Sequence, residues 1–217
     1  MQYIIKKGDT MSKIAHRFSL PVKSLFVLNP QIIDPNKIFI GQVIQVPNLS
    51  DVPNDADFET PSNPTELVLR ARSVVNSSIG YKLGSGGMFP KDALPSRDNF
   101  CDCSGFVCWV LHLSRKTDIP FYKHFGGWIF TDSMEADVQR NAGIFEKLQF
   151  PEPGCIVVYG AGAKIGHVGL VSDVSGNVMK KVIHCSLGNS NKFNAAIQET
   201  APTVFNRADA VWGRFVG

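Results

Sequence analysis

The sequence predicts a two-domain protein of the α+β class, in which a small β-α-α-β domain precedes a larger domain of helices packed on an antiparallel sheet. Charge divides the 217 residues into three parts. Residues 1–48 carry six basic and two acidic residues, residues 49–66 carry five acidic and no basic residues, and the remainder carries 16 basic and 12 acidic residues. The acidic part also contains three prolines, a composition typical of a semi-extended linker. We therefore expect domains at residues 1–48 and 66–217, joined by a linker at residues 49–65.

The composition excludes several classes of protein. Apolar residues make up 44% of the chain and charged residues 19%, which is typical of a globular protein with a sizeable core. The apolar runs are only a few residues long, whereas a membrane span needs roughly 20. Residues 1–7 contain no apolar segment of the kind found in a Sec signal peptide. The net charge of +3 permits an anionic partner without indicating nucleic acid, so we expect neither a membrane nor a nucleic acid as partner.

The first domain alternates between strand and helix patterns. A short β-type run at residues 3–6 is followed at residues 8–10 by a turn and a helix cap, and apolar residues then recur at helical spacing. Pro21 begins a second helix, which ends at residues 29–30. Residues 41–47 alternate like a second strand, which completes the β-α-α-β order.

Three motifs occur here in order: KGDT at residues 7–10, Asn29-Pro30 at the end of the second helix, and IGQVIQVP at residues 40–47. Together they resemble the LysM module, and the resemblance implies binding of glycans that contain N-acetylglucosamine, usually peptidoglycan or chitin. In that family the glycan groove lies between the first strand–helix loop and the loop after the second helix. On the matched positions, the candidate glycan-binding residues are Gly8, Asp9, Thr10, Asn29, Pro30, Gln31 and Ile32. Asp9 and Thr10 are equally compatible with a role as helix caps alone.

The second domain contains a cysteine at the start of a predicted buried helix. A first helix is expected near Thr65, and a glycine-rich loop follows at residues 84–87. Apolar residues then dominate residues 106–113, which predicts a buried helix with Cys103 in its first turn. Unpaired N–H groups and the helix dipole stabilise negative charge at such a position. This position favours a reactive thiol with a depressed pKa at Cys103. The tetrapeptide alone is too short to decide between that role and inert packing in the core.

The other cysteines have a different expected role. The chain contains five cysteines, so at least one is unpaired, and their spacing matches no zinc ribbon. A disulfide framework is not expected in a chain with this much core. Cys108 and Cys155 lie in apolar runs and are expected to pack in the core, whereas the role of Cys101 is open.

Two histidines follow in a region of predicted strands. Residues 155–159 form a predicted hairpin with a strand that begins at His167, and a third strand contains His184. Adjacent antiparallel strands can place these two histidines side by side, and the helix that carries Cys103 can pack across the same sheet. A thiol, a histidine that takes its proton and a polar group that orients this histidine form an activated nucleophile.

Four motifs occur in order along the second domain: DCSG at residues 102–105, PG at 153–154, GHVG at 166–169 and IH at 183–184. Together they resemble the NlpC family of papain-like cell-wall cysteine peptidases, and the resemblance covers residues 66–217. It implies a peptidoglycan hydrolase, a thiol endopeptidase that cuts stem peptides, commonly between γ-D-glutamate and the following diamino acid, through an acyl-enzyme. On the matched positions it implies Cys103 as nucleophile, His167 as general base and His184 as the orienting residue, with the Cys103 N–H in the oxyanion hole. It further implies substrate-binding roles for Tyr81, Asp102 and Ser104, the last two at positions that in relatives recognise the free amino end of a stem peptide.

The sequence leaves several alternatives open. The same triad is compatible with an N-acetylmuramoyl-L-alanine amidase or an acyl transferase, and a vestigial thiol pocket is compatible with a non-catalytic wall-binding protein. A zinc site built from Cys103, His167 and His184 has no obvious fourth ligand, so we expect no metal and no other cofactor. The expected partner is peptidoglycan, through both its stem peptide and its glycan. Without a signal peptide, action at the cell wall fits a secreted antibacterial effector, a phage lysis enzyme or a spore-associated enzyme, and the first of these allows for a neutralising partner protein.

Overall fold

The computed structural model describes residues 2–7, 9–11, 14, 25, 29, 32, 38–46, 63–160, 162 and 165–217. The chain divides into two compact units, the first formed mainly by Met1–Phe58 and the second by most of Glu59–Gly217. Both units contain strands, and the second contains several helices, so the predicted α+β class is confirmed. The expected linker lies almost wholly outside the described residues, and its boundaries stay a prediction.

The smaller unit is held together by a pair of short strands. Strand β1 (Gln2–Ile4) pairs antiparallel with β2 (Val43–Gln45), so that Tyr3 lies opposite Ile44. The two expected helices fall largely outside the described residues, although Met11, Ile14 and Leu25 are helical. One strand residue, residues next to the two strands and these helical positions share one core, and Tyr3 of β1 packs against it. The core is formed by Ile5, Met11, Ile14, Leu25, Ile32, Ile44 and Val46.

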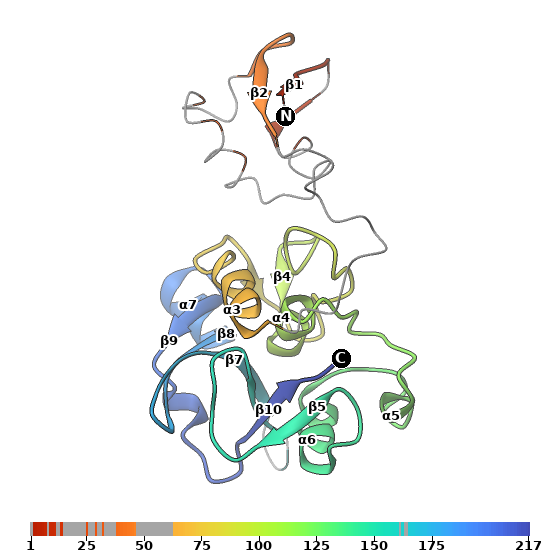
Figure 1. Ribbon diagram of the computed structural model, residues 1–217, viewed down its shortest axis with the longest axis vertical. Helices are drawn as coiled ribbons and strands as arrows, with labels where there is room; N and C mark the ends of the chain where they lie inside the picture. The colour runs from red at the N-terminus through yellow and green to blue at the C-terminus, as the bar shows by residue number, and fades with distance from the viewer. Residues whose placement is uncertain are drawn as a thin grey trace. The chain divides into compact units, whose positions relative to one another are not determined.

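The larger unit is built on a six-stranded sheet with the order β5-β10-β6-β7-β8-β9. Strand β10 lies beside β5 in this sheet (Figure 1). Each neighbouring pair is antiparallel, as the sequence predicted. The strands are β5 (Phe145–Leu148), β6 (Ile156–Tyr159), β7 (His167–Ser175), β8 (Val178–Cys185), β9 (Ile197–Thr200) and β10 (Val211–Phe215). The predicted β6–β7 hairpin and the turn between β7 and β8 are both present.

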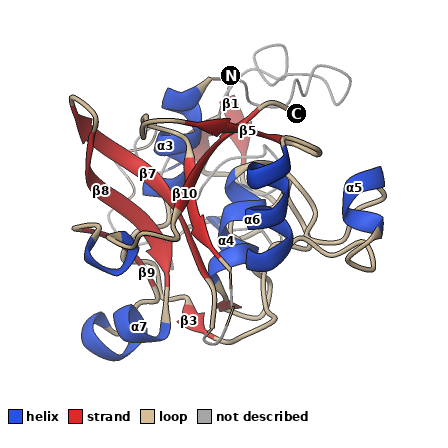
Figure 2. Cartoon of the chain, turned by 90° about the horizontal axis from the view of Figure 1, so that it is seen from below, coloured by secondary structure: helices blue, strands red, loops and turns tan. Residues whose placement is uncertain are grey.

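Helices pack on this sheet, as Figure 2 shows for α4 and α6. Helix α4 contacts β7 and β8, α6 contacts β5, β6 and β10, and α3 contacts β7. Every residue of α4 is buried, because the helix is apolar on all sides and lies in the main core. The helices are α3 (Pro64–Arg72), α4 (Cys103–Val110), α5 (Pro120–Lys123), α6 (Thr131–Arg140), α7 (Leu187–Phe193) and the 3₁₀ turn η1 (Thr203–Phe205). Two short strands, β3 (Gly80–Tyr81) and β4 (Phe100–Cys101), pair in parallel just before α4.

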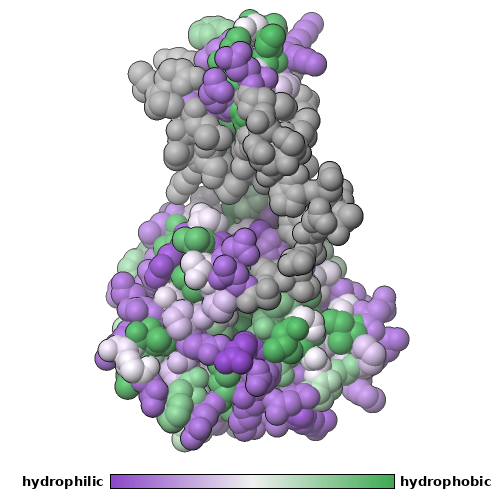
Figure 3. Space-filling view, in the orientation of Figure 1, coloured by the Kyte–Doolittle hydropathy of each residue, from purple (hydrophilic) through white to green (hydrophobic). Residues whose placement is uncertain are grey.

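The opposite face of the sheet carries a second apolar cluster, formed by Cys155, Val157, Val171, Met179, Val182 and Phe205. Apolar and hydrophilic side chains are intermixed on the visible face of the larger unit (Figure 3). Within the described parts of the chain, no helix has both the length and the hydrophobicity that crossing a bilayer requires.

Candidate active site

Cys103 is the first residue of α4, as the sequence predicted. Asp102 caps this helix, because its carboxylate accepts a hydrogen bond from Gly105 N at 2.8 Å. The preceding glycine-rich loop approaches the helix so closely that a Cβ atom on Gly105 would lie 2.5 Å from the carbonyl oxygen of Ser85. The Cys103 thiol is buried and lies at the backbone N–H groups of Val168 and Ser104. The fold therefore brings the start of α4 to the start of β7.

His167 and His184 lie at the same end of the sheet, because β7 begins with one and the antiparallel strand β8 ends beside the other. His167 Nε2 is 2.8 Å from His184 Nδ1, so the predicted side-by-side arrangement is confirmed. Leu170 pairs with Ile183, which places Gly169 opposite His184. A Cβ atom on Gly169 would lie 3.1 Å from His184 Cβ and 3.0 Å from the ring of Phe205. Glycine at this position gives both rings room to pack.

An aromatic ring covers the histidine pair. Phe205 stacks on His167 with ring centroids 5.1 Å apart and an interplanar angle of 12°. It meets His184 edge to face, at 5.5 Å and 84°. Burial, and secondly the neighbouring His184, lower the pKa of His167 to about 3. Burial likewise lowers the pKa of His184 to about 4, so both imidazoles are neutral at pH 7.

The expected depressed pKa of the Cys103 thiol is wrong. Burial raises its pKa to about 12, and the adjacent Asp102 carboxylate acts in the same direction. The N–H groups of Val168 and Ser104 lower the pKa, as expected for a helix start, but removal of the thiol from water outweighs them. The thiol and both imidazoles are therefore neutral at rest, and attack by this thiol requires transfer of its proton to a base.

Tyr81 lies near this thiol. It ends β3, is half-buried, and interacts electrostatically with Cys103. Burial is the largest factor that raises its pKa to about 12, so its hydroxyl is neutral and able to donate a hydrogen bond at pH 7.

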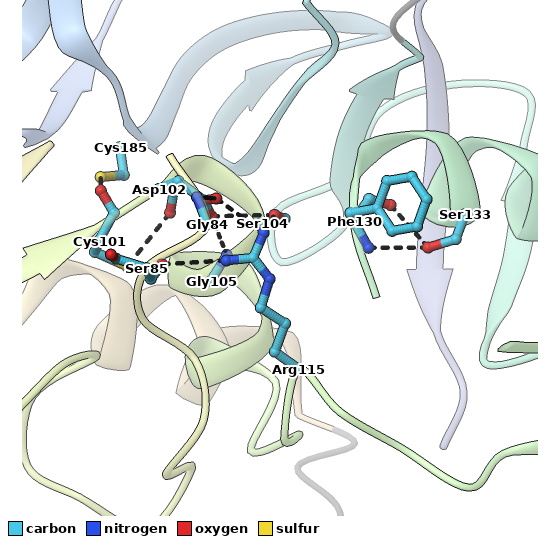
Figure 4. A network of polar contacts seen from close by, with 10 residues as sticks. All are labelled: Gly84, Ser85, Cys101, Asp102, Ser104, Gly105, Arg115, Phe130, Ser133 and Cys185. Carbon is cyan, nitrogen blue, oxygen red and sulfur yellow. Dashed lines mark hydrogen bonds and ion pairs between the residues drawn. The ribbon is translucent and has the colours of Figure 1, made fainter. Parts of the chain in front are cut away.

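Asp102 and Ser104 do not fit the predicted role in recognising a free amine (Figure 4). Their exposed fractions are only 1% and 3%. Asp102 Oδ1 accepts from Gly105 N and from the Ser104 hydroxyl, and Oδ2 accepts from Gly84 N and Arg115 Nη2. The Asp102–Arg115 ion pair is 2.8 Å long and buried. The carboxylate is thus neutralised and fully hydrogen-bonded within the fold, which leaves no anion for a substrate amine.

The candidate glycan-binding residues have different environments. Asn29 is 0% exposed. Its side-chain Nδ2 donates to Gln45 O at 2.7 Å, and its Oδ1 accepts from Gln45 N at 2.6 Å. Ile32 belongs to the core. Both residues are therefore structural, which corrects the expectation for them.

Asp9 is half-buried and accepts hydrogen bonds from Tyr3 Oη and Lys6 N at 2.7 and 2.8 Å, while Thr10 is exposed. Gly8, Pro30 and Gln31 lie outside the described residues.

The other four cysteines are buried and form no disulfide bonds. Burial raises the pKa of Cys108 and, to about 12, that of Cys155, as expected for core residues. In the part of the chain that the structure describes, no three His, Cys, Asp or Glu side chains are grouped so as to hold a metal ion.

Three residues at or next to this site were not predicted from the sequence. Arg115 lies beyond the end of α4, and nothing in its local sequence indicates that it returns to Asp102. Phe205 belongs to the short turn η1, which has no clear periodic pattern. Thr200 ends β9, and its Oγ1 lies 3.0 Å from His184 Nε2. Its strand pairs with β8, so a correct prediction of sheet order would have found it.

Two known families match parts of the chain. Residues 3–47 match the LysM domain and residues 95–189 match the CHAP domain. The chain is thus similar to a LysM domain followed by a CHAP domain. The CHAP domain is a papain-like cysteine amidase or peptidase domain, and its match includes Cys103, His167 and His184. This match supports a papain-like cysteine amidase or peptidase domain and does not distinguish the NlpC family within that class.

Curated relatives resemble short stretches of the chain. The endolysin of Bacillus phage B103 is 50% identical over 44 residues, which is 20% of this chain and 17% of that protein. The N-acetylmuramoyl-L-alanine amidase XlyB of Bacillus subtilis is 52% identical over 46 residues, 21% of this chain and 14% of the amidase. The secreted LysM effector ECP6 of Passalora fulva is 33% identical over 67 residues, 30% of this chain and 29% of the effector. The similarity to the endolysin and the amidase covers only the LysM region, and the matched stretches span less than a third of each relative.

Proposed function

We propose that this protein is a peptidoglycan hydrolase that cleaves an amide bond of the stem peptide through Cys103. The observation that carries the proposal is the approach of the Cys103 thiol to the start of β7, beside a His167–His184 pair with a 2.8 Å contact. The buried thiol lies at the N–H of Val168, the residue that follows His167, and His167 is paired with His184. This combination has the parts of an activated nucleophile.

The raised pKa of the Cys103 thiol and the lowered pKa of His167 favour a mechanism in which the proton moves during attack. Because thiol and imidazole are both neutral, Cys103 Sγ attacks the carbonyl carbon while its proton moves to His167. The Cys103 N–H, which has no acceptor within its own helix, is placed to bind the oxyanion. His167 then returns the proton to the leaving amine, which leaves an acyl-thioester on Cys103. Water hydrolyses this thioester, with His167 acting as base, and regenerates the thiol.

The bond we favour is the one between γ-D-glutamate and the following diamino acid, as the NlpC resemblance implies. The Asp102–Arg115 ion pair restricts which stem peptides the site can recognise. The Asp102 carboxylate is already bonded within the fold, so it is not free to bind the amino end of a released stem. We therefore infer that the stem is cleaved while it is attached to glycan. The same observation favours one second candidate, hydrolysis of the N-acetylmuramoyl-L-alanine bond, which exists only in attached stems.

The LysM domain supplies the other half of the proposal. A glycan-binding module on the same chain holds the enzyme on an insoluble polymer and raises the local substrate concentration. The names of the relatives, phage endolysins and a secreted LysM effector, support action at the cell wall. They are compatible with the phage-lysis and secreted-effector routes expected from the sequence.

Mass spectrometry of defined muropeptides tests the proposal. We expect the wild type to release a product cut after γ-D-glutamate and Cys103→Ala to release none, since loss of a nucleophile costs on the order of 10⁶ in kcat. Cys108→Ala is the matched control, because it removes a buried thiol from the same helix and should retain activity. Separation of the intact stem from the glycan would favour the amidase. Activity retained by Cys103→Ala, or no product from the wild type, would contradict the proposal.

A further inference from the structure

The polar contacts behind the histidine pair continue through Thr200 to the carbonyl oxygen of Ala201. Strand β9 pairs with β8, so Gln198 lies opposite His184 and Thr200 lies two residues further along the same strand. Thr200 Oγ1 is 3.0 Å from His184 Nε2 and 3.0 Å from the carbonyl oxygen of Ala201. Thr200 is therefore joined both to the histidine pair and to a group that can only accept.

The contact with Ala201 O favours one direction for these bonds. The Thr200 hydroxyl has one proton and donates it to Ala201 O, so it faces His184 Nε2 as an acceptor. The other polar neighbour of this nitrogen is Asn189 Nδ2, at 3.5 Å. Asn189 Nδ2 is itself a donor, and it also contacts two carbonyl oxygens, those of His184 and Ala196, at 3.2 and 3.4 Å. Among the described neighbours, Thr200 is thus the acceptor for a proton on His184 Nε2.

We propose that Thr200 is a positioning residue that sets the tautomer of both histidines and so leaves His167 Nδ1 free to take the thiol proton. This inference rests on the proposed function. With its proton on Nε2, His184 presents a bare Nδ1, which accepts from His167 Nε2–H at 2.8 Å. His167 then carries no proton on Nδ1, the nitrogen that is left for the thiol.

The opposite direction would disable the base. If His184 carried its proton on Nδ1, it would donate to His167 Nε2, and the neutral His167 would hold its proton on Nδ1. That nitrogen would then be a donor and unable to accept from Cys103. Because each neutral imidazole has a single proton, the hydroxyl of Thr200 decides between an active and an inactive pair.

A pair of variants of the full-length protein tests this. Thr200→Val keeps the shape of the side chain and removes the hydroxyl, whereas Thr200→Ser keeps the hydroxyl. The imidazole ¹⁵N chemical shifts, assigned with His167→Ala and His184→Ala, report the tautomer of each ring. We expect Nε2–H on both rings in the wild type and in Thr200→Ser, and loss of this pattern in Thr200→Val.

Kinetics on a soluble muropeptide provide the second readout. We expect Thr200→Val to lower kcat about 10- to 100-fold with little change in KM, and Thr200→Ser to restore it, since general-base catalysis contributes about 10²–10⁴. An Nδ1 proton on His184 in the wild type overturns the inference even if Thr200→Val does not fold. Unchanged tautomers and unchanged kcat in Thr200→Val overturn it as well. If the wild type cleaves no muropeptide, the proposed function fails, while the NMR measurement still decides the tautomer.

Discussion

The buried ion pair beside the nucleophile leads to a quantitative prediction about stability. Arg115 Nη2 lies 2.8 Å from Asp102 Oδ2, and the two side chains are 8% and 1% exposed. Removal of one partner from such a pair leaves an uncompensated buried charge and costs about 3–5 kcal/mol. In Arg115→Met the carboxylate keeps its three other hydrogen-bond donors. We therefore expect a cost near the lower limit, about 3 kcal/mol.

Arg214→Met is the matched control, because it makes the same chemical change at a more exposed position of the same unit. Arg214 pairs with Glu146 at 2.9 Å and with Glu152 at 2.6 Å, and its side chain is 44% exposed. Ion pairs in contact with water contribute about 0–1 kcal/mol, since solvent screens them. The control should therefore lower the free energy of unfolding by about 1 kcal/mol.

Thermal unfolding followed by tryptophan fluorescence measures both variants. Trp109, Trp128 and Trp212, the three tryptophans of the chain, all belong to the larger unit, so the signal reports that unit alone. At about 2–4 °C per kcal/mol for a domain of this size, Arg115→Met should lower Tm by about 6–12 °C. A decrease no larger than that of Arg214→Met would refute the argument from buried charge.

Three further predictions concern the site and the LysM domain. Burial lowers the pKa of His167 to about 3, so the acid limb of the kcat/KM profile should lie below pH 5, and an acid limb at pH 6.5 would contradict this. The free energy of unfolding should also decrease as the pH drops below about 6.5, because at those pH values only the unfolded chain takes up a proton on this histidine. Gly169→Ala places a Cβ atom 2.5 Å from Val182 Cγ1, so it should lower the free energy of unfolding in urea by about 1–3 kcal/mol and should also lower activity. Gly188→Ala is the control, because its Cβ atom would lie 3.9 Å from its nearest neighbour, and it should change stability little. Deletion of residues 1–48 should weaken hydrolysis of intact sacculi far more than hydrolysis of soluble muropeptides, and an equal loss on both would refute the tethering role.

Local patterns in the sequence account for the part of the site that lies on regular elements. Cys103 could be placed at a helix start because it comes just before the apolar run at residues 106–113, and α4 begins there. The strands of His167 and His184 could be placed because β-branched runs flank a Ser-Gly-Asn turn, and antiparallel pairing then brings their ends together. Each of these inferences needed only short-range spacing and the geometry of one hairpin.

The environment of each side chain could not be predicted in the same way. The pKa of Cys103 depends on how deeply the fold buries it, and helix position alone gave the wrong direction. The sequence suggested that Asp102 is an exposed anion, whereas in the structure its carboxylate pairs with Arg115, 13 residues further along the chain. Asn29 suggested a groove residue, yet its amide bonds β2 at Gln45, 16 residues away. Such contacts depend on tertiary structure, which a single sequence does not specify by local spacing.

The Asp102–Arg115 pair also bears on reactivity, and the reason is electrostatic. A carboxylate next to a thiol opposes thiolate formation, and Asp102 raises the pKa of Cys103. Arg115 lowers the same pKa, so the pair places compensating charges beside the nucleophile while Asp102 still caps α4. A neutral cap would avoid the opposing charge, but it would lose the charge-assisted bonds that fix the glycine-rich loop and the helix start. The buried arginine therefore lets one carboxylate position the nucleophile with less opposition to its ionisation.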